Sequence, residues 1–326
     1  MNKLYIGCGG WAYADFGDYP GSQLRNYSKL FNFVEVNSTF YNIPKITQCE
    51  RWRNTVPSDF SFAVKCNRGV SHIGLLEPSK KFFKVFNKIV DICKILKAIA
   101  LVIQTPTNFL SNSQNLKNAA DFFANVESPV SLVWEVRGYQ KYPQLRSELL
   151  QIFSEYDITH CTDISKNVPI YTTNMVYSRI FGLGKQNMWQ FSDDEIKLLH
   201  NQVKNLREET KEKRVVLSFH TMRMERDAAR YQEFSNNNIL IPATDSVGLK
   251  SIMDVVKEFN KFPISKEELI EAHGWKIVDL TPNLRVRASQ LLEKLPNQKF
   301  PSFEFIENQL RNILGKISQK KLEHFF

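Results

Sequence analysis

Eight short apolar runs, separated by longer stretches of helical periodicity, recur along this sequence and constrain its fold more than any other feature. Each run is rich in β-branched residues and nearly continuous in apolar character, which is typical of parallel strands covered on both faces. A period of roughly 30 residues per unit matches a closed barrel of about 250 residues. We therefore predict an α/β chain built on a (β/α)8 TIM-type barrel. Its predicted strands are Leu4 to Cys8, Phe33 to Asn37, Phe60 to Lys65, Ile99 to Gln104, Val130 to Val136, Ile158 to Asp163, Met175 to Ile180 and Val215 to Phe219.

Helix signals fill the segments between these strands and dominate the C-terminal part. The run Ser192-Asp193-Asp194-Glu195 is a capping box that opens an amphipathic stretch. Leucines and isoleucines recur at helical spacing over Leu284 to Leu295 and over Ser302 to Ile317. We predict a barrel over residues 1–248 and a helical C-terminal appendage over residues 249–326.

Cysteine usage and charge narrow the class of protein. The five cysteines form no C-x-x-C pair, so the sequence encodes neither a disulfide framework nor a cysteine-based zinc site. The N-terminus has no signal-peptide pattern, and no run of eighteen apolar residues occurs. We therefore expect a cytoplasmic protein with no membrane partner. The net charge of +9 favours anionic partners, either a small molecule or nucleic acid, and the sequence leaves the oligomeric state open.

Polar side chains at the carboxyl ends of the predicted strands indicate a functional site. In a barrel these strand ends face the loops that build active sites, and residues of one parity point inward. Glu35 and Asn37 share one parity, as do Glu135 and Arg137. A buried carboxylate without a partner costs several kcal/mol, so Glu35 is either paired or catalytic. The other strands that end in, or carry, polar groups contribute Lys65, Gln104, Asp163, Arg179 and His220.

Several motifs follow one another in a specific order over about residues 4 to 235. They are Gly7 to Trp11, Phe33 to Tyr41 with Pro44, Arg51-Trp52, Phe60 to Lys65, Ser71-His72, Trp134 to Arg137, Asp163, and Tyr177 to Arg179. Together they resemble the family called domain of unknown function 72, the YecE-like barrels. The resemblance implies a TIM-type barrel and no established reaction.

Two places depart from the pattern of that family. Phe219-His220-Thr221 stands where the family usually has Phe-Asn-Asn, and Phe181-Gly182 stands where a histidine usually precedes the glycine. Either the substrate contacts differ or the activity has drifted.

The leading hypothesis is a hydrolase-type enzyme that acts on a phosphate ester or a nucleic-acid-like substrate at the C-terminal rim. Lys65, Arg137 and Arg179 would hold the anion, and a glutamate would serve as general acid or base. The candidate catalytic residues are Glu35, Glu135, Asp163 and His220, and the candidate substrate-binding residues are Trp11, Asn37, Tyr41, Lys65, His72, Gln104, Trp134, Arg137 and Arg179. A metal-dependent version would use the four catalytic candidates to hold a divalent metal ion, although three intermingled cations argue against it.

Other hypotheses stay open. In the first, a metal-free enzyme acts on a sugar or a carboxylate, with Glu35 and Glu135 as its two carboxyl groups and Trp11, Tyr41 and Trp134 as an apolar platform. In the second, a non-catalytic protein binds nucleic acid through its basic surface and its C-terminal helices. A purely structural interpretation is that both glutamates simply neutralise the cations inside the barrel mouth.

Overall fold

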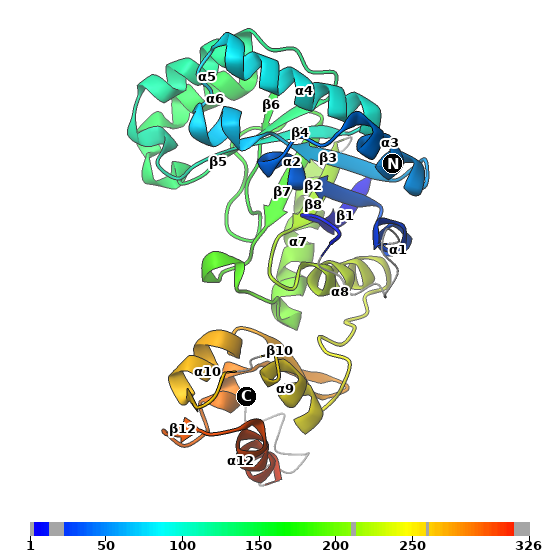
Figure 1. Ribbon diagram of the computed structural model, residues 1–326, viewed down its shortest axis with the longest axis vertical. Coiled ribbons are helices and arrows are strands. Elements are labelled where there is room, and N and C mark those ends of the chain that lie inside the picture. The colour runs from blue at the N-terminus through cyan, green and yellow to red at the C-terminus, as the bar shows by residue number, and fades with distance from the viewer. Residues whose placement is uncertain (1–2, 13–22, 210–212, 259–260, 316–326) are drawn as a thin grey trace. The chain divides into compact units, whose positions relative to one another are not determined.

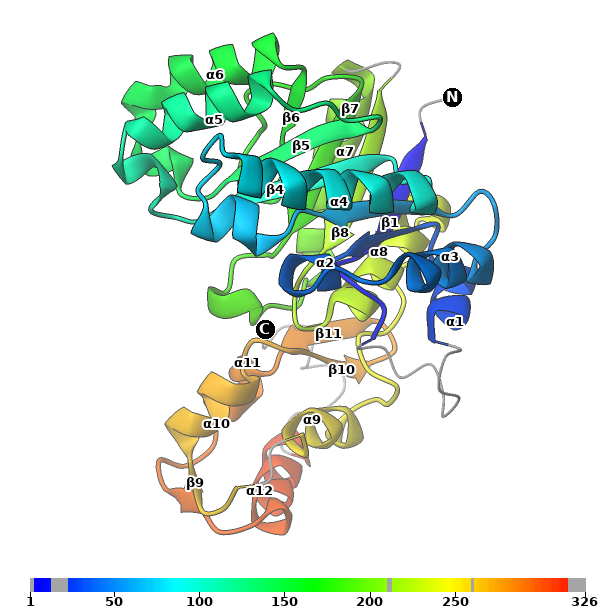
Figure 2. The ribbon, with the colours of Figure 1, turned by 45° about the horizontal axis from the view of Figure 1, so that its top comes forward.

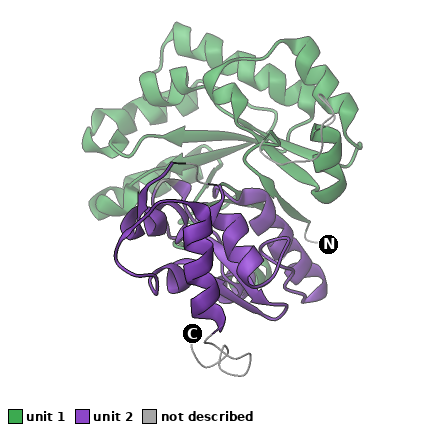
Figure 3. Ribbon diagram, turned by 60° about the horizontal axis from the view of Figure 1, so that its bottom comes forward, with its two compact units in different colours: residues 1–180, 202–220 green, residues 181–201, 221–326 purple. Residues whose placement is uncertain are grey.

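The computed structural model describes residues 3–12, 23–209, 213–258 and 261–315 of the chain. The fold comprises two compact units, one formed by Met1–Ile180 with Gln202–His220 and the other by Phe181–Asn201 with Thr221–Phe326 (Figure 3). The predicted domain boundary near residue 248 stays a prediction.

A parallel sheet forms the interior of the first unit. Within the described residues it has eight strands, in the order β6-β5-β4-β3-β2-β1-β8-β7. Strand β1 pairs in parallel with β8 along its whole length, and a bridge joins Thr162, two residues beyond the end of β6, to Ser178 of β7. The sheet is thus nearly closed into a barrel, as the eight apolar runs predict. The strands are β1 (Leu4–Cys8), β2 (Phe33–Val36), β3 (Ser61–Lys65), β4 (Ala100–Thr105), β5 (Ser131–Val136), β6 (Ile158–His160), β7 (Met175–Ile180) and β8 (Arg214–Phe219).

Helices cover the outer face of this sheet (Figures 1 and 2). Helix α4 contacts β3 and β4, and it buries one face that includes Phe86, Ile89 and Cys93. Each large apolar side chain buried in this way contributes roughly 1.5–3 kcal/mol. The helices of this unit are α1 (Gln23–Leu30), α2 (Ser38–Tyr41), α3 (Ile46–Thr55), α4 (Lys80–Leu96), α5 (Gln114–Ala124), α6 (Arg146–Glu155) and the second half of α7 (Asp193–Glu209). The predicted capping box opens α7, because Ser192 N donates to Glu195 Oε2 and Glu195 N donates to Ser192 Oγ.

The barrel interior is packed with side chains. A buried cluster there comprises Tyr5, Phe33, Ala63, Ala100, Val102, Val133, Cys161, Met175, Tyr177 and Val216. Side chains on a strand alternate between the two faces, so the residue two positions further along each strand points inward as well. In six strands that next inward position is polar, and it is occupied by Glu35, Lys65, Gln104, Glu135, Arg179 and Ser218. An apolar layer therefore supports a polar layer at the C-terminal end of the barrel.

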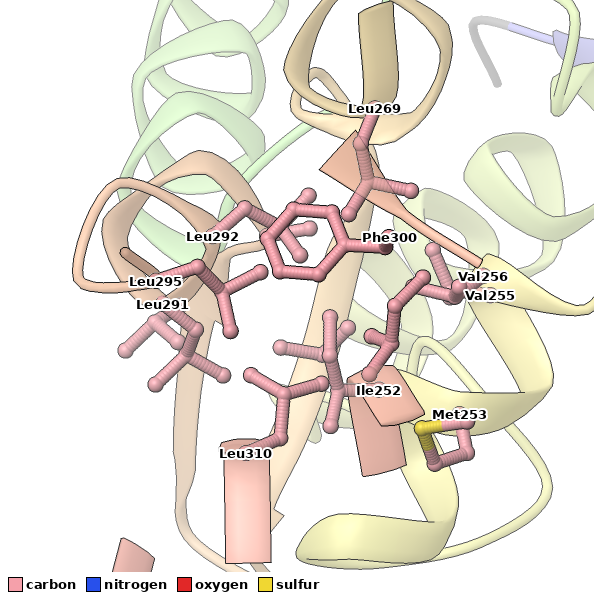
Figure 4. Close-up of a cluster of buried hydrophobic side chains, with 14 of the residues drawn as sticks. Ile252, Met253, Val255, Val256, Leu269, Leu291, Leu292, Leu295, Phe300 and Leu310 are labelled. Carbon is pink, nitrogen blue, oxygen red and sulfur yellow. The ribbon is translucent and has the colours of Figure 1, made fainter. Parts of the chain in front are cut away.

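The second unit holds the C-terminal helices and two short antiparallel sheets. Its elements beyond α7 are α8 (Met224–Asn237), α9 (Leu249–Val256), β9 (Ile264–Ser265), α10 (Lys266–His273), β10 (Ile277–Thr281), β11 (Leu284–Arg287), α11 (Ser289–Leu292), β12 (Lys299–Phe300) and α12 (Phe303–Gly315). A hydrophobic core joins the elements from α9 to α12, and in Figure 4 Leu269, Leu292, Leu295 and Phe300 converge on it.

The prediction of one helix over Leu284 to Leu295 is wrong for its first residues. Leu284–Arg287 alternates apolar and basic residues with period two, and it pairs with β10 as a hairpin. The helix is confined to Ser289–Leu292. The predicted helix over Ser302 to Ile317 is present as α12, and residues 316–317 lie outside the described part of the chain. In the described residues, no helix is both long and apolar enough to cross a membrane.

Candidate active site at the barrel mouth

The centre of the polar layer is a buried arginine held between two carboxylates. Arg179 Nε lies 3.1 Å from Glu35 Oε1, and Arg179 Nη1 lies 2.6 Å from Glu135 Oε2. Arg179 is 3% exposed, and Glu35 is fully buried. The three side chains come from β7, β2 and β5, so the ion pairs connect strands that are distant in sequence. Removing any one of the three would leave an uncompensated buried charge, so each charge depends on the other two.

Both carboxylates are held in the ionised form. Burial is the largest single effect and raises the pKa of each carboxyl group, but Arg179 together with the other neighbouring charges and hydrogen bonds outweighs it at both positions. With the additional help of Arg137, the pKa of Glu135 falls to about 2. The pKa of Glu35 also falls well below its usual range, because His220 and Lys65 add to the effect of Arg179. For Arg179 itself burial lowers the pKa, and the two carboxylates reverse that and raise it above its ordinary value.

Neighbouring polar groups complete the network around each carboxylate. Tyr177 donates its hydroxyl to Glu35 Oε2 at 2.8 Å. Gln104 donates to Glu135 Oε2 at 2.9 Å, and Arg137 Nε donates to Glu135 Oε1 at 3.2 Å. The Arg137 side chain is 41% exposed, in contrast to the buried Arg179. Arg137 is therefore the cation of this network that a molecule at the mouth can reach.

Lys65 lies at the end of β3 in a different environment. Its Nζ is 4.3 Å from the centre of the Phe40 ring, and the residue is 8% exposed. Among the described residues no carboxylate lies within 4.0 Å of this ammonium group. Burial, followed by the charge of Arg179, lowers the pKa of Lys65 to about 7, against the opposing charges of Glu35 and Glu135. At neutral pH this amine is therefore present in both its charged and its neutral form.

His220 lies beside Glu35 and Arg179 just after β8. Its Nε2 is 3.5 Å from Glu35 Oε2 and 3.2 Å from Arg179 Nε, and it contacts Ser218 Oγ at 3.0 Å. Burial and the Arg179 charge lower the pKa of His220 to about 4, so the ring is neutral at pH 7. Gly9 makes room for this ring, because a Cβ at position 9 would lie 2.3 Å from His220 Nδ1. Asn37 Nδ2 fixes the same loop by donating to Gly9 O.

The loop after β3 adds a second histidine to the mouth. Ser71 and His72 lie in a π-helical turn, Gly69–Ile73, and Ser71 Oγ is 3.0 Å from His72 Nδ1. The His72 ring packs edge-on against Phe40, the ring that also faces Lys65. Burial and the charge of Lys65 lower the pKa of His72 to about 4. Such π-helical turns are frequent at functional sites.

Four further residues predicted from sequence have surroundings of their own. Trp134 is fully buried among Phe109, Phe123 and Phe153, on the helix-facing side of β5. Asp163 accepts hydrogen bonds from the backbone and hydroxyl of Ser165, and it lies 3.6 Å from Lys166 in the same loop. Trp11 packs edge-on against Trp52. Tyr41 is 64% exposed at the end of α2, and its ring packs edge-on against Phe40 at 5.0 Å.

Sequence reasoning missed three contributors to the site. Tyr177 and Ser218 have the inward parity of Arg179 and His220, so the alternation along β7 and β8 already contained the signal. Phe40 belongs to the stretch Phe33 to Tyr41, but its contacts with Lys65 and His72 depend on the tertiary fold. In the described parts of the chain no group of three or more His, Cys, Asp or Glu side chains is arranged to hold a metal ion.

Comparisons with known proteins agree on the fold. A family model described as "Protein of unknown function DUF72" matches residues 5–237. Two proteins called UPF0759 protein YecE, from Escherichia coli K12 and O157:H7, are each 35% identical over 69 residues, which is 21% of this chain and 25% of theirs. The chain is thus matched over about a quarter of the length of these relatives.

Solved structures of DUF72 family proteins resemble this chain as well. The one from Thermotoga maritima has a TM-score of 0.60 and 20% identity, covering 72% of this chain and 99% of its own. The one from Enterococcus faecalis has a TM-score of 0.55 and 20% identity, with 73% and 99% covered. At this level of identity the likeness concerns the fold alone.

Proposed function

This chain belongs to the DUF72 family and has a barrel fold, and we propose that it is an enzyme that binds and cleaves a phosphate ester at the C-terminal mouth of the barrel. The observation that carries the proposal is the separation of the cations into two kinds. Arg179 is buried between two carboxylates, whereas the Arg137 side chain is 41% exposed, and Lys65, which is 8% exposed, forms no ion pair with a described carboxylate. An anionic group is the ligand class that these two cations would attract.

In this proposal the glutamates have a positioning role. Glu135 contacts Arg179 with one carboxylate oxygen and Arg137 with the other. It therefore orients the guanidinium of Arg137, which would contact the substrate. Glu35 anchors Arg179 and Tyr177 from the other side. A planar guanidinium with a fixed orientation matches the oxygen geometry of a phosphate group. Such preorganised charge stabilises the negative charge that develops during phosphoryl transfer.

Lys65 fits the role of the proton-transfer group. A group with a pKa near the working pH serves best as a general acid or base, and the surroundings of Lys65 bring its pKa to about 7. As an ammonium group it would protonate the leaving oxygen of an ester. Binding of an anion nearby would favour this protonated form.

The glycosidase-like alternative has less support. Such a mechanism needs one carboxyl group with a raised pKa to act as the acid. Both Glu35 and Glu135 have lowered pKa values here, because they share Arg179. Trp134, which that hypothesis uses as part of an apolar platform, is enclosed by aromatic side chains.

Binding and turnover by matched arginine variants test the proposal. We would titrate sulfate and inorganic phosphate by calorimetry, and follow phosphate release from a panel of mono- and diesters with and without Mg²⁺. Arg137→Met should weaken anion binding by about tenfold, the equivalent of one charged hydrogen bond. Arg25→Met, which removes an exposed arginine from α1, serves as the control. Equal affinities in both variants, or no turnover of any ester by the wild type, would refute the proposal.

A further inference from the structure

A cavity of about 230 Å³ lies within the second unit, and the described residues that line it are not those of the barrel mouth. Arg223 and Arg226 line it from the beginning of α8, three residues apart and therefore on one side of the helix. Asp254 and Glu258 line it from α9 and the turn that follows α9. The cavity thus receives cations from one helix and carboxylates from another, and it suits a ligand that carries both signs of charge.

The two carboxylates differ in whether a cation already neutralises them. Glu258 is paired with Arg223 and also lies 2.6 Å from Lys276 Nζ. Asp254 accepts a hydrogen bond from Ser246 Oγ at 2.6 Å, but it forms no ion pair with any cation that the structure describes. A carboxylate that lines a cavity without a cationic partner is available to a positively charged group of a ligand.

Arg226 is available to a negatively charged group, because its partner in the protein is exposed. Its Nη2 lies 2.5 Å from Asp245 Oδ1, and the Asp245 side chain is 88% exposed. An exposed ion pair of this kind contributes little to stability, so the carboxylate of a ligand can take the place of Asp245 at small cost. The N-terminus of α8 adds partial positive charge at the same place.

The binding positions for the two signs of charge lie close together. Asp245, which contacts Arg226, and Ser246, which contacts Asp254, are consecutive residues. Consecutive Cα atoms are about 3.8 Å apart, so one small molecule in this cavity can reach both the guanidinium and the free carboxylate.

Gln190 brings an uncharged donor to the same cavity. The residue is 2% exposed, and its Oε1 accepts a hydrogen bond from Ile277 N at 2.8 Å. This bond fixes the orientation of the carboxamide, because only the oxygen can accept. The Nε2 group donates to no atom in the described part of the chain. Since buried polar groups are normally hydrogen-bonded, this donor indicates an acceptor atom supplied by a ligand.

We propose that this cavity binds a small α-amino acid in its zwitterionic form. Arg226 and Gln190 Nε2 hold the α-carboxylate, and Asp254 holds the α-ammonium group. Ala243 and Val255 are buried and also line the cavity, so they leave an apolar place for a short side chain. The volume agrees with this size, because sites for drug-sized ligands have roughly 300–1,000 Å³. The amino-acid site and the phosphate-ester site at the barrel mouth are independent of each other.

Binding of L-valine and of two analogues that each lack one charge tests this proposal. We would use calorimetry on the full chain, with ligand-observed NMR for the weaker analogues. Valine should bind with a dissociation constant below about 1 mM. N-acetyl-L-valine lacks the ammonium group and L-valinamide lacks the carboxylate, so each should bind at least about tenfold more weakly, the equivalent of one charged hydrogen bond.

Two variants assign each charge of the ligand to its partner. Asp254→Asn keeps the size of the side chain and an acceptor for Ser246, and it should weaken valine and valinamide by about tenfold while leaving N-acetylvaline unchanged. Arg226→Met should weaken valine and N-acetylvaline while leaving valinamide unchanged. Glu271→Gln removes an exposed carboxylate of α10 in the same unit and should bind valine like the wild type. Thermal melts would confirm that each variant is folded.

The outcomes that overturn the proposal are distinct. If valine, alanine and serine all fail to bind at millimolar concentration, the cavity is not an amino-acid site. If both analogues bind as tightly as valine, or if Asp254→Asn binds valine as tightly as Glu271→Gln does, the zwitterionic ligand is wrong. If N-acetylvaline alone binds as tightly as valine, the cavity is an anion site and Asp254 has no part in binding.

Discussion

Replacing Glu35 with glutamine tests whether the buried network is a main support of the barrel. Glu35 is fully buried and accepts hydrogen bonds from Tyr177 Oη at 2.8 Å and from Arg179 Nε at 3.1 Å. Removing one partner of a buried ion pair costs about 3–5 kcal/mol. Glu135 still neutralises Arg179 in the variant, so we expect the lower end, about 3 kcal/mol. For a unit of this size that corresponds to a melting temperature lower by about 6–12 °C.

The pH dependence of this loss has a definite sign. The folded-state pKa of Glu35 lies below its ordinary value, so its contribution is fully present above the unfolded pKa of about 4.3 and is lost as the pH falls toward the folded value. The difference in unfolding free energy between the wild type and Glu35→Gln should therefore stay constant from about pH 8 to pH 5 and shrink below about pH 4.

Urea unfolding and hydrogen exchange of the β2 and β7 amides would measure this effect in the barrel itself. Glu50→Gln, at an exposed position of α3, is the control and should change stability by less than about 0.5 kcal/mol. Combining Glu35→Gln with Arg179→Met should cost less than the sum of the single changes, because both charges are then removed. A loss under about 1 kcal/mol for Glu35→Gln, or strict additivity in the double variant, would contradict the reasoning.

Three further predictions follow from single contacts. Sulfate affinity of the wild type should fall as the pH rises from about 6 to 8, because Lys65 loses its charge near pH 7. Lys65→Arg should bind sulfate with constant affinity over the same range, and calorimetry at fixed ionic strength would compare the two proteins. Gly9→Ala should destabilise the barrel by about 1–3 kcal/mol in thermal melts, because its Cβ would overlap His220, whereas Gly315→Ala, with open space at its Cβ, should not. Trp134→Phe should lower the free energy of unfolding by about 1–3 kcal/mol, because the hydrogen bond to Thr105 and some packing are lost. Sulfate affinity should stay unchanged, and a weaker affinity would show that Trp134 contributes to the site after all.

The barrel and most of the polar layer could be predicted from the sequence, because both follow from local periodicity. Apolar runs that are covered on both faces place the strands, and strand alternation then decides which side chains point inward. Glu35, Gln104, Glu135 and Arg179 each follow an interior core residue by two positions, so parity alone brings them together. What parity does not provide is the pairing, because the bonds of Arg179 to both glutamates depend on distances across the barrel.

Trp134 and the end of β6 show where this reasoning reached its limit. Trp134 has the opposite parity to Glu135, so its aromatic ring packs on the helix side of the sheet, and consistent use of the alternation would have excluded it. The prediction extends this strand to Asp163, whereas β6 ends at His160 and only single contacts continue it, from Cys161 N to Trp134 O and between Thr162 and Ser178. A short strand end of this kind has no signature in composition.

Burial separates the charged residues of the mouth by the role that they can take. A charge that is fully enclosed and paired, as in Arg179, contributes to the fold but cannot change partners without a large cost in free energy. The Arg137 side chain is 41% exposed although it also contacts Glu135, and Lys65 is 8% exposed. In the function that we propose, an anion therefore contacts Arg137 while the ion pairs of Arg179 stay intact. The glutamates are needed for the function that we propose, but they act on it through the cations that they position.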